Sequence, residues 1–185
     1  LAKAHPGKIN YAAGTIGATP HLAGEQFKVM AGVNVVRVSY KGTGPGLIAL
    51  MSGEVEFMFP GAASAWMYVK QNRLKGLAIC SLKPSSLFPG VPTLSESGLP
   101  GYDRSGWYGM VASSKVPREI VVQLSGELTK AVTHPETKAS LVKQGLDPYT
   151  NKPEEFAAYI KNEIAQNAKL IALDRKSTRL NSSHI

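Results

Sequence analysis

The feature that most constrains the fold of this chain is the alternation of strand patterns and helix patterns between Ile9 and Cys80. Runs of β-branched and aromatic residues predict short strands, and each run is followed by a loop and by apolar residues at helical spacing. The predicted strands are a short one beginning at Ile9 and those at residues 35–39, 55–59 and 74–80, and the predicted helices cover residues 20–31, 46–52 and 62–72. Strands that alternate with helices pair in parallel, because each helix carries the chain back to the same end of the sheet. We therefore expect an α/β fold with a mainly parallel sheet covered by helices.

The connection between the first strand and the first helix is the best marked candidate site. It holds two glycines and the hydroxyl groups of Thr15 and Thr19, and it carries no acidic or basic side chain. Thr19 is a favoured N-cap, Pro20 suits the first helical position, and Gly32 suits the helix stop. Free N–H groups at a helix start, together with the positive end of the helix dipole, favour a carboxylate or a phosphate. A tight connection with a well-capped helix is the alternative interpretation.

The same connection differs from the common nucleotide-binding loops. The Gly-Lys-Ser/Thr ending of a P-loop is missing, and so is the G-x-G-x-x-G spacing of a dinucleotide-binding turn. The sequence therefore favours a small organic anion as the ligand.

Composition narrows the class of protein further. The chain has 185 residues, of which 43% are hydrophobic, so it can bury a core as one domain or as two small lobes. No apolar run approaches the roughly 18 residues needed to span a bilayer. The chain begins at Leu1 without an initiator Met or a signal peptide, and we expect it to be a piece of a longer protein.

The charge and the reactive side chains give little support to nucleic-acid binding, metal binding or catalysis. The net charge of +8 comes from Lys and Arg residues that are scattered singly, which indicates a solvated basic surface rather than a nucleic-acid site. Cys80 lies in an apolar run and is expected to be a buried strand residue, with a catalytic thiol as the lesser alternative. The four histidines have no metal-site spacing, and no G-x-S-x-G elbow is present. A binding protein is the leading hypothesis, and an enzyme acting on a small carboxylate is the alternative.

The second half of the chain changes in character. Residues 83–101 are rich in Pro, Gly and Ser and predict a surface connection. One more strand is predicted at residues 107–112, followed by helices at 118–132, 135–144 and 153–172. Pro117, Pro135 and Pro153 each open a helical pattern, and Gly145 supplies a stop. These helices need a sheet to cover, and most of that sheet is not among the predicted elements.

Five motifs in this order resemble one family closely. They are His-Leu-Ala-Gly-Glu from His21, Ser-Tyr-Lys-Gly from Ser39, Gly-Glu-Val-Glu-Phe-Met-Phe from Gly53, Pro-Gly-Val-Pro-Thr-Leu-Ser-Glu-Ser-Gly-Leu-Pro-Gly-Tyr from Pro89, and Trp-Tyr-Gly from Trp107. The chain resembles the Bug-type periplasmic solute-binding receptors of tripartite tricarboxylate transporters from Leu1 to about Ala172. The long motif that begins at Pro89 is the most specific of the five.

The resemblance implies a periplasmic-binding-protein-like α/β fold of type II, with two lobes that close on a ligand like a flytrap and with most of the first lobe missing. Residues 1–102 would form the second ligand-binding lobe, and residues 103–173 the crossover strand and returning helices of the first. Residues 174–185 have no counterpart in the family and resemble a non-native tail, so they are left out of the fold prediction.

The resemblance also implies a function. Such a receptor captures a small organic carboxylate or an amino acid in the periplasm and presents it to the membrane components of a transporter, or in some relatives to a sensor kinase. It performs no catalysis, uses no cofactor or metal, and binds no nucleic acid.

Candidate ligand-binding residues follow by position from the resemblance. The second gripping loop of the family corresponds to Gly14, Thr15, Gly17, Ala18 and Thr19, and His21 is expected to orient this loop or to cap the helix. Tyr40 and Lys41 match a Pro-Tyr-Lys-Gly turn in which Ser39 replaces the usual Pro; a solvated strand-to-helix turn is the alternative. Gly61 and Ser64 follow a strand end. Many relatives have Asp where this chain has Pro60, so any contact of that Asp with an amino group is lost.

Overall fold

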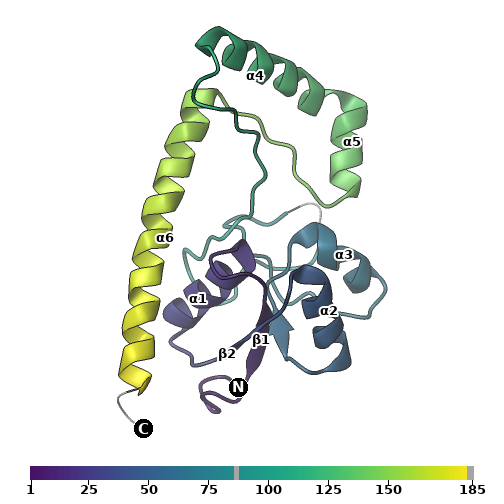
Figure 1. Cartoon of the computed structure of the whole chain (residues 1–185). Coiled ribbons are helices and arrows are strands. Elements are labelled where there is room, and N and C mark those ends of the chain that lie inside the picture. The colour runs from purple at the N-terminus through teal and green to yellow at the C-terminus, as the bar shows by residue number, and fades with distance from the viewer. Residues whose placement is uncertain (86–87, 183–185) are drawn as a thin grey trace. The chain divides into compact units, whose positions relative to one another are not determined.

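The structure is a computed structural model that describes residues 1–85 and 88–182, with side chains described as far as residue 172. The chain divides into two compact units (Figure 1). The first unit comprises residues 1–106 and the stretch that begins at Lys169, and the second comprises Trp107–Ala168. Among the described residues, no helix is both long enough and apolar enough to cross a membrane.

The first unit is built on a three-stranded parallel sheet with the strand order β2-β1-β3. The strands are β1 (Asn10–Ala13), β2 (Val36–Ser39) and β3 (Phe57–Met58). The helices that alternate with them are α1 (Thr19–Ala31), α2 (Thr43–Ser52) and α3 (Ala62–Lys70). The expected alternation and the parallel pairing are both confirmed.

Successive residues of the central strand β1 serve the two faces of the sheet. Tyr11 is fully buried on one face, where its ring stacks on that of Phe57 at a centroid distance of 5.5 Å and lies against Gly24 of α1. Ala12, the next residue, packs on the other face with Ala49 of α2 and with Val55. This period of two places α1 and α2 on opposite faces of the sheet.

Several element boundaries differ from the prediction. Ala18, not Thr19, is the N-cap of α1, and no side chain caps this helix, so Thr19 is its first residue and Pro20 its second. The prediction of Gly32 as the stop is confirmed, because Gly32 is the left-handed C-cap. Helix α2 begins at Thr43, earlier than predicted, because Gly42 turns the chain with a φ of 100° that favours glycine.

The strand predicted at residues 74–80 does not form. Only Ile79 makes a bridge, a parallel one to Thr93, and the rest of that segment is irregular. A strand needs continuous pairing with a neighbour, which a run of apolar residues cannot supply by itself. Cys80 consequently lies in a bend rather than a strand, and burial raises the pKa of its thiol to about 11, which keeps the sulfur protonated and argues against a catalytic thiol.

The connection after this bridge is fastened to α1. Tyr102 is fully buried, and its hydroxyl donates a hydrogen bond of 2.9 Å to the carbonyl oxygen of Ala23. Thr93 is also fully buried, and it shares reciprocal hydrogen bonds with Glu96 in the manner of a capping box. The Pro- and Gly-rich connection is therefore anchored to α1 at Tyr102 and is closed on itself between Thr93 and Glu96.

The second unit contains helices only. They are α4 (Arg118–Thr133), α5 (Pro135–Lys143) and the first part of α6 (Pro153–Ser182), which lies in this unit as far as Ala168. Pro117 is the N-cap of α4, and Pro135 and Pro153 open the next two helices, as predicted. Gly145 follows α5 with a φ of 77°, which confirms the predicted stop.

Two predictions for this part of the chain are not met. Helix α6 continues to Ser182 instead of ending near Ala172, and the last three residues of the expected tail lie outside the described residues. Residues 107–112 are irregular, because no strand of the second unit is available, within its described residues, to pair with them. Trp107 packs edge-on against Phe156 and Tyr159 instead, at centroid distances of 5.2 and 5.8 Å.

Candidate functional site

The predicted site residues of the first unit gather at one edge of its sheet. Because the three strands are parallel, their carboxyl ends share an edge, and each strand there leads into the N-terminus of a helix (Figure 1). The loop from Gly14 follows β1, the turn at Tyr40 and Lys41 follows β2, and Gly61 follows β3 as the N-cap of α3.

The first two of these loops touch. The N–H of Tyr40 donates a 2.9 Å hydrogen bond to the carbonyl of Ala13, the last residue of β1. A Cβ atom added to Gly14 would lie 3.7 Å from the Cα of Gly42, which is ordinary contact. The loop after β3 shares the edge through the pairing of Ala12 with Met58. The structure thus brings the predicted loops to one side of the sheet.

Each of the three helices presents unpaired N–H groups at this edge. Within the described part of the chain, no acceptor is found for the N–H groups at the start of α1, α2 and α3, namely those of Thr19, His21, Thr43, Gly44, Ala62 and Ala63. None of these three helices has an acidic residue in its first turn. The edge therefore combines donors with the positive ends of three helix dipoles, an arrangement suited to an anion.

The predicted side chains differ in whether they are available for contact with a ligand. Thr15, Thr19, Lys41 and Ser64 are exposed at or near the edge. The hydroxyl of Tyr40 instead donates a 2.8 Å hydrogen bond to Glu54. Tyr40 therefore contributes to this edge through its backbone, and its phenol is directed to Glu54.

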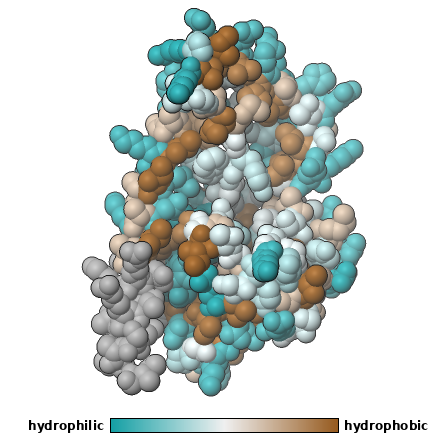
Figure 2. Space-filling model, in the orientation of Figure 1, coloured by the Kyte–Doolittle hydropathy of each residue, from teal (hydrophilic) through white to brown (hydrophobic). Residues whose placement is uncertain are grey.

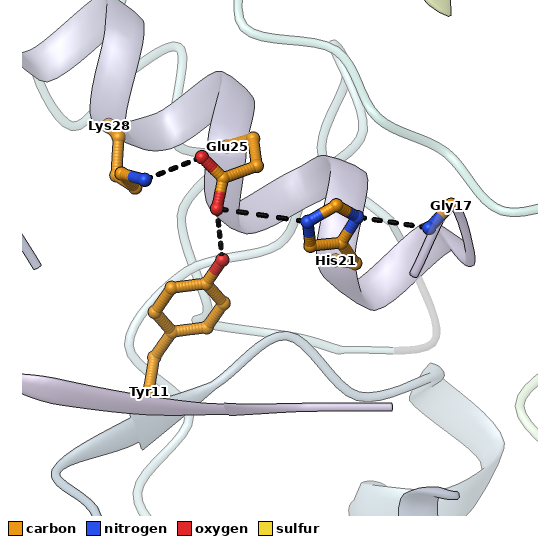
Figure 3. A network of polar contacts seen from close by, with 5 residues as sticks. All are labelled: Tyr11, Gly17, His21, Glu25 and Lys28. Atoms are coloured by element: carbon orange, nitrogen blue, oxygen red, sulfur yellow. Dashed lines mark hydrogen bonds and ion pairs between the residues drawn. The ribbon is translucent and has the colours of Figure 1, made fainter. Parts of the chain in front are cut away.

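His21 is buried and forms a hydrogen bond with the backbone of the first loop. Its Nδ1 accepts a 3.0 Å hydrogen bond from the N–H of Gly17, a glycine with a φ of 85° (Figure 3). The side of the ring that carries Nε2 faces Glu25, whose Oε1 lies 3.9 Å away. The N–H of Gly17 is thus already paired within the chain, and the bond joins His21 to the loop that it was expected either to orient or to cap.

Glu25 is the centre of a buried polar network that the sequence analysis did not identify (Figure 3). Its side chain accepts hydrogen bonds of 2.6 Å from the hydroxyl of Tyr11 and from Nζ of Lys28, and Glu25 is only 4% exposed. His21, Glu25 and Lys28 are four and three residues apart on α1, which places them on one face of the helix. That spacing is the signal in the sequence that could have revealed the network.

The surroundings of His21 favour its neutral form. Burial lowers the pKa of His21 below its usual value of 6.5, and the cation of Arg37 lowers it further. Glu25 acts in the opposite direction, and Lys28 adds a smaller lowering. A neutral imidazole can leave Nδ1 unprotonated, which the bond from Gly17 requires.

The chain is similar in sequence to one family of known proteins. The model of the tripartite tricarboxylate transporter family receptor matches residues 1–174. The chain is 32% identical, over 92% of its length, to the UPF0065 protein from the tcbD–tcbE intergenic region of Pseudomonas sp. strain P51, and 28% identical, over 91%, to BugT of Bordetella pertussis. It covers 51% and 52% of these two proteins, so the chain spans about half the length of the curated relatives it matches.

Solved structures agree with this similarity. The structure of Rpa4515 of R. palustris with adipate superposes with a TM-score of 0.84 at 28% identity, covering 91% of this chain and 56% of that one. The periplasmic binding protein BugD gives 0.80 at 30% identity, with 92% and 58% covered. MatC of Rhodopseudomonas palustris with bound malate gives 0.77 at 26% identity, with 92% and 59% covered. The predicted fold, a part of a periplasmic-binding-protein fold, is confirmed.

Proposed function

Because the chain belongs to the tripartite tricarboxylate transporter receptor family, we propose that its first unit holds a carboxylate of the ligand in a periplasmic solute-binding receptor. The observation that carries the proposal is the set of three helix N-termini at one sheet edge, with unpaired N–H groups and no acidic residue in their first turns. Each helix dipole contributes about 0.3–1 kcal/mol to the binding of an anion at such a position. Hydrogen bonds from N–H groups to a carboxylate add to this, since bonds to a charged acceptor are stronger than neutral ones.

The ligand class follows from the chemistry of the edge. Adipate and malate, the molecules present with two of the similar structures, are both dicarboxylates. The position after Phe59 is Pro60, so the loop after β3 offers no carboxylate to an ammonium group there. We therefore expect dicarboxylates to bind better than amino acids of similar length.

The wider role of the protein is proposed on the same basis. The receptor would bind its ligand without catalysis and deliver it to the membrane components of a tripartite transporter, in line with the description of the family. A periplasmic location is supported by the similarity to BugD. Presentation of the bound ligand to a sensor kinase is the alternative to delivery to a transporter.

The division of the chain into units supports the proposed lobes. The boundary at Gly106 and Trp107 falls close to the expected end of the second ligand-binding lobe at residue 102. Apolar surface is exposed on the second unit (Figure 2). Met110, Val111 and Val122 are among its exposed apolar residues. We propose that residues 103–173 belong to the other lobe, in which such apolar faces are covered by a sheet.

A thermal-shift experiment tests the ligand class. The chain is heated with millimolar adipate or malate, with 1,6-hexanediol as a neutral molecule of the same carbon length as adipate, and with glutamate, a dicarboxylate that also carries an ammonium group. Adipate or malate should raise the Tm by a few degrees at ten times its Kd, because binding at that ratio stabilises by about 1.4 kcal/mol. The neutral diol should have no effect, and glutamate should have less effect than adipate and malate because of its ammonium group.

Substitutions test whether the rise in Tm depends on the loop between β1 and α1. The double variant Thr15→Ala and Thr19→Ala should reduce the Tm rise, whereas Ser114→Ala, which removes an exposed hydroxyl in the second unit, should leave it unchanged. An equal rise with 1,6-hexanediol, or with glutamate, would contradict the proposed ligand class. A rise that both variants preserve would contradict the role of the threonine hydroxyls.

A further inference from the structure

We propose that neutral His21 is the positioning residue of the ligand loop, so that protonation of its ring releases the loop and weakens carboxylate binding at this edge. The inference rests on the proposed function, and it adds a regulation of the same site by pH. His21 would act through the backbone of Gly17 and would not touch the ligand with its own ring.

The ring of His21 contacts the loop that precedes α1. Nδ1 of His21 accepts the N–H of Gly17 at 3.0 Å, and the N–H of Ala18 donates to the carbonyl of Thr15 at 3.1 Å. The two bonds together close a turn and fasten it to the first turn of α1. The donors proposed for the ligand, such as the N–H of Thr19, follow directly after this turn. Their direction therefore depends on the bond to His21.

The hydrogen bond to the loop fixes which ring nitrogen of His21 carries the proton. An Nδ1 that accepts a hydrogen bond is unprotonated, so the neutral ring carries its hydrogen on Nε2, on the side that faces Glu25. The carboxylate of Glu25 is held in turn by Tyr11 of β1 and by Lys28 of α1. This network favours the tautomer in which Nδ1 is free to accept.

Acid removes the acceptor on His21 that the loop needs. A protonated imidazole has a hydrogen on both nitrogens, so Nδ1–H and the N–H of Gly17 would be two donors directed at each other. The charged groups around the ring are Glu25 and Lys28 on α1 and Arg37 on β2, with the phenol of Tyr11 on β1. Glu25 favours the imidazolium, whereas Arg37, Lys28 and burial oppose it. Protonation therefore occurs only below the usual range for histidine, and when it occurs the bond to Gly17 is lost.

Nuclear magnetic resonance of the full chain, without any ligand, tests whether protonation of His21 breaks the hydrogen bond of the Gly17 N–H. Ring nitrogen shifts report the tautomer and the titration of His21, and the amide signal of Gly17 reports its hydrogen bond. We expect the Gly17 amide to move with the same midpoint as the His21 ring, and that midpoint to lie below pH 6.5. A Gly17 amide that does not follow the His21 titration would overturn the inference.

The second measurement is the Kd for adipate, obtained from amide shifts at pH 7.5 and at a pH below the His21 midpoint. Affinity should fall about fivefold on acidification, as expected for the loss of one hydrogen bond that orders the loop. In His21→Asn the side-chain oxygen takes the place of Nδ1 as an acceptor but does not titrate, so that variant should keep its affinity and lose the extra pH dependence. His5→Asn, at an exposed histidine, should behave like the unchanged chain.

The comparison separates failure of the inference from failure of the proposed function. Ionisation of adipate affects all three proteins equally and cancels in the comparison. If adipate and malate fail to bind at any pH while Gly17 follows His21, the proposed function is contradicted and the positioning role of His21 stands. If adipate binds with the same pH dependence in the unchanged chain and in His21→Asn, the inference is contradicted and the proposed function stands.

Discussion

Gly24 shows how one residue supports the polar network beneath the candidate site. A Cβ atom added to Gly24 would lie 2.3–2.7 Å from ring atoms and the hydroxyl of Tyr11, which is fully buried and donates to Glu25. Only glycine lets α1 approach the sheet closely enough for that bond. The sequence contains Gly24 in a helical pattern, where glycine costs helix stability, and the close approach explains why it is there.

Substitution of Gly24 gives a prediction at this scale. Gly24→Ala should lower the free energy of unfolding by about 1–3 kcal/mol, because the added methyl overpacks the Tyr11 contact. Gly126→Ala is the matched control: Gly126 is also inside a helix, but nothing lies within 4 Å of its added Cβ, so this change should stabilise by up to about 1 kcal/mol. Urea unfolding followed by circular dichroism measures both. Equal effects of the two substitutions would contradict the packing argument.

For individual residues, the sequence allowed the candidate loop residues to be named, but it did not reveal the partners of the side chains around them. Gly14, Thr15 and Thr19 stand out because small and hydroxyl-bearing residues before a helix have a known use. The contact of Tyr11 with Glu25 joins a strand to a helix and depends on the packing of α1 on the sheet. Pairings of this kind have no signature in a single sequence. The use of Tyr40, which turns to Glu54, was missed for the same reason.

Among the elements, helix boundaries were more predictable than strands. Pro135, Pro153 and Gly145 mark their boundaries through backbone geometry that is local to the residue itself. A strand forms only where a neighbour pairs with it, and within the described part of the chain residues 74–80 find one only at the Ile79 bridge and residues 107–112 find none. Local signals therefore located the helices, apart from the starts of α1 and α2 and the end of α6, but they were insufficient for these two strands.

The anchoring of the Pro- and Gly-rich connection to α1 leads to a prediction for this element. Tyr102→Phe removes the hydroxyl that donates to the carbonyl of Ala23 and leaves that buried acceptor without this bond. The free energy of unfolding should fall by about 1–2 kcal/mol. Tyr149→Phe, at a residue that is 81% exposed, should change it by less than about 0.5 kcal/mol. If Tyr102→Phe is as stable as the control, this bond does not hold the connection in place.

On the scale of the whole molecule, the chain belongs to the tripartite tricarboxylate transporter receptor family and spans about half the length of its curated relatives. The family and fold could be predicted because the motifs from Pro89 to Tyr102 and at Trp107 are specific. The identity of the ligand could not be predicted, since the donors at the edge are mostly backbone N–H groups, which recognise a carboxylate and not the rest of the molecule.

Amide spectra of the labelled chain during titration with adipate would show whether a carboxylate binds at the helix N-termini of the first unit. We expect the largest shifts on the amides at the starts of α1, α2 and α3, among them Thr19, Gly44 and Ala63, and we expect none from 1,6-hexanediol. Shifts that saturate elsewhere, or that the neutral diol reproduces, would contradict binding of a carboxylate there.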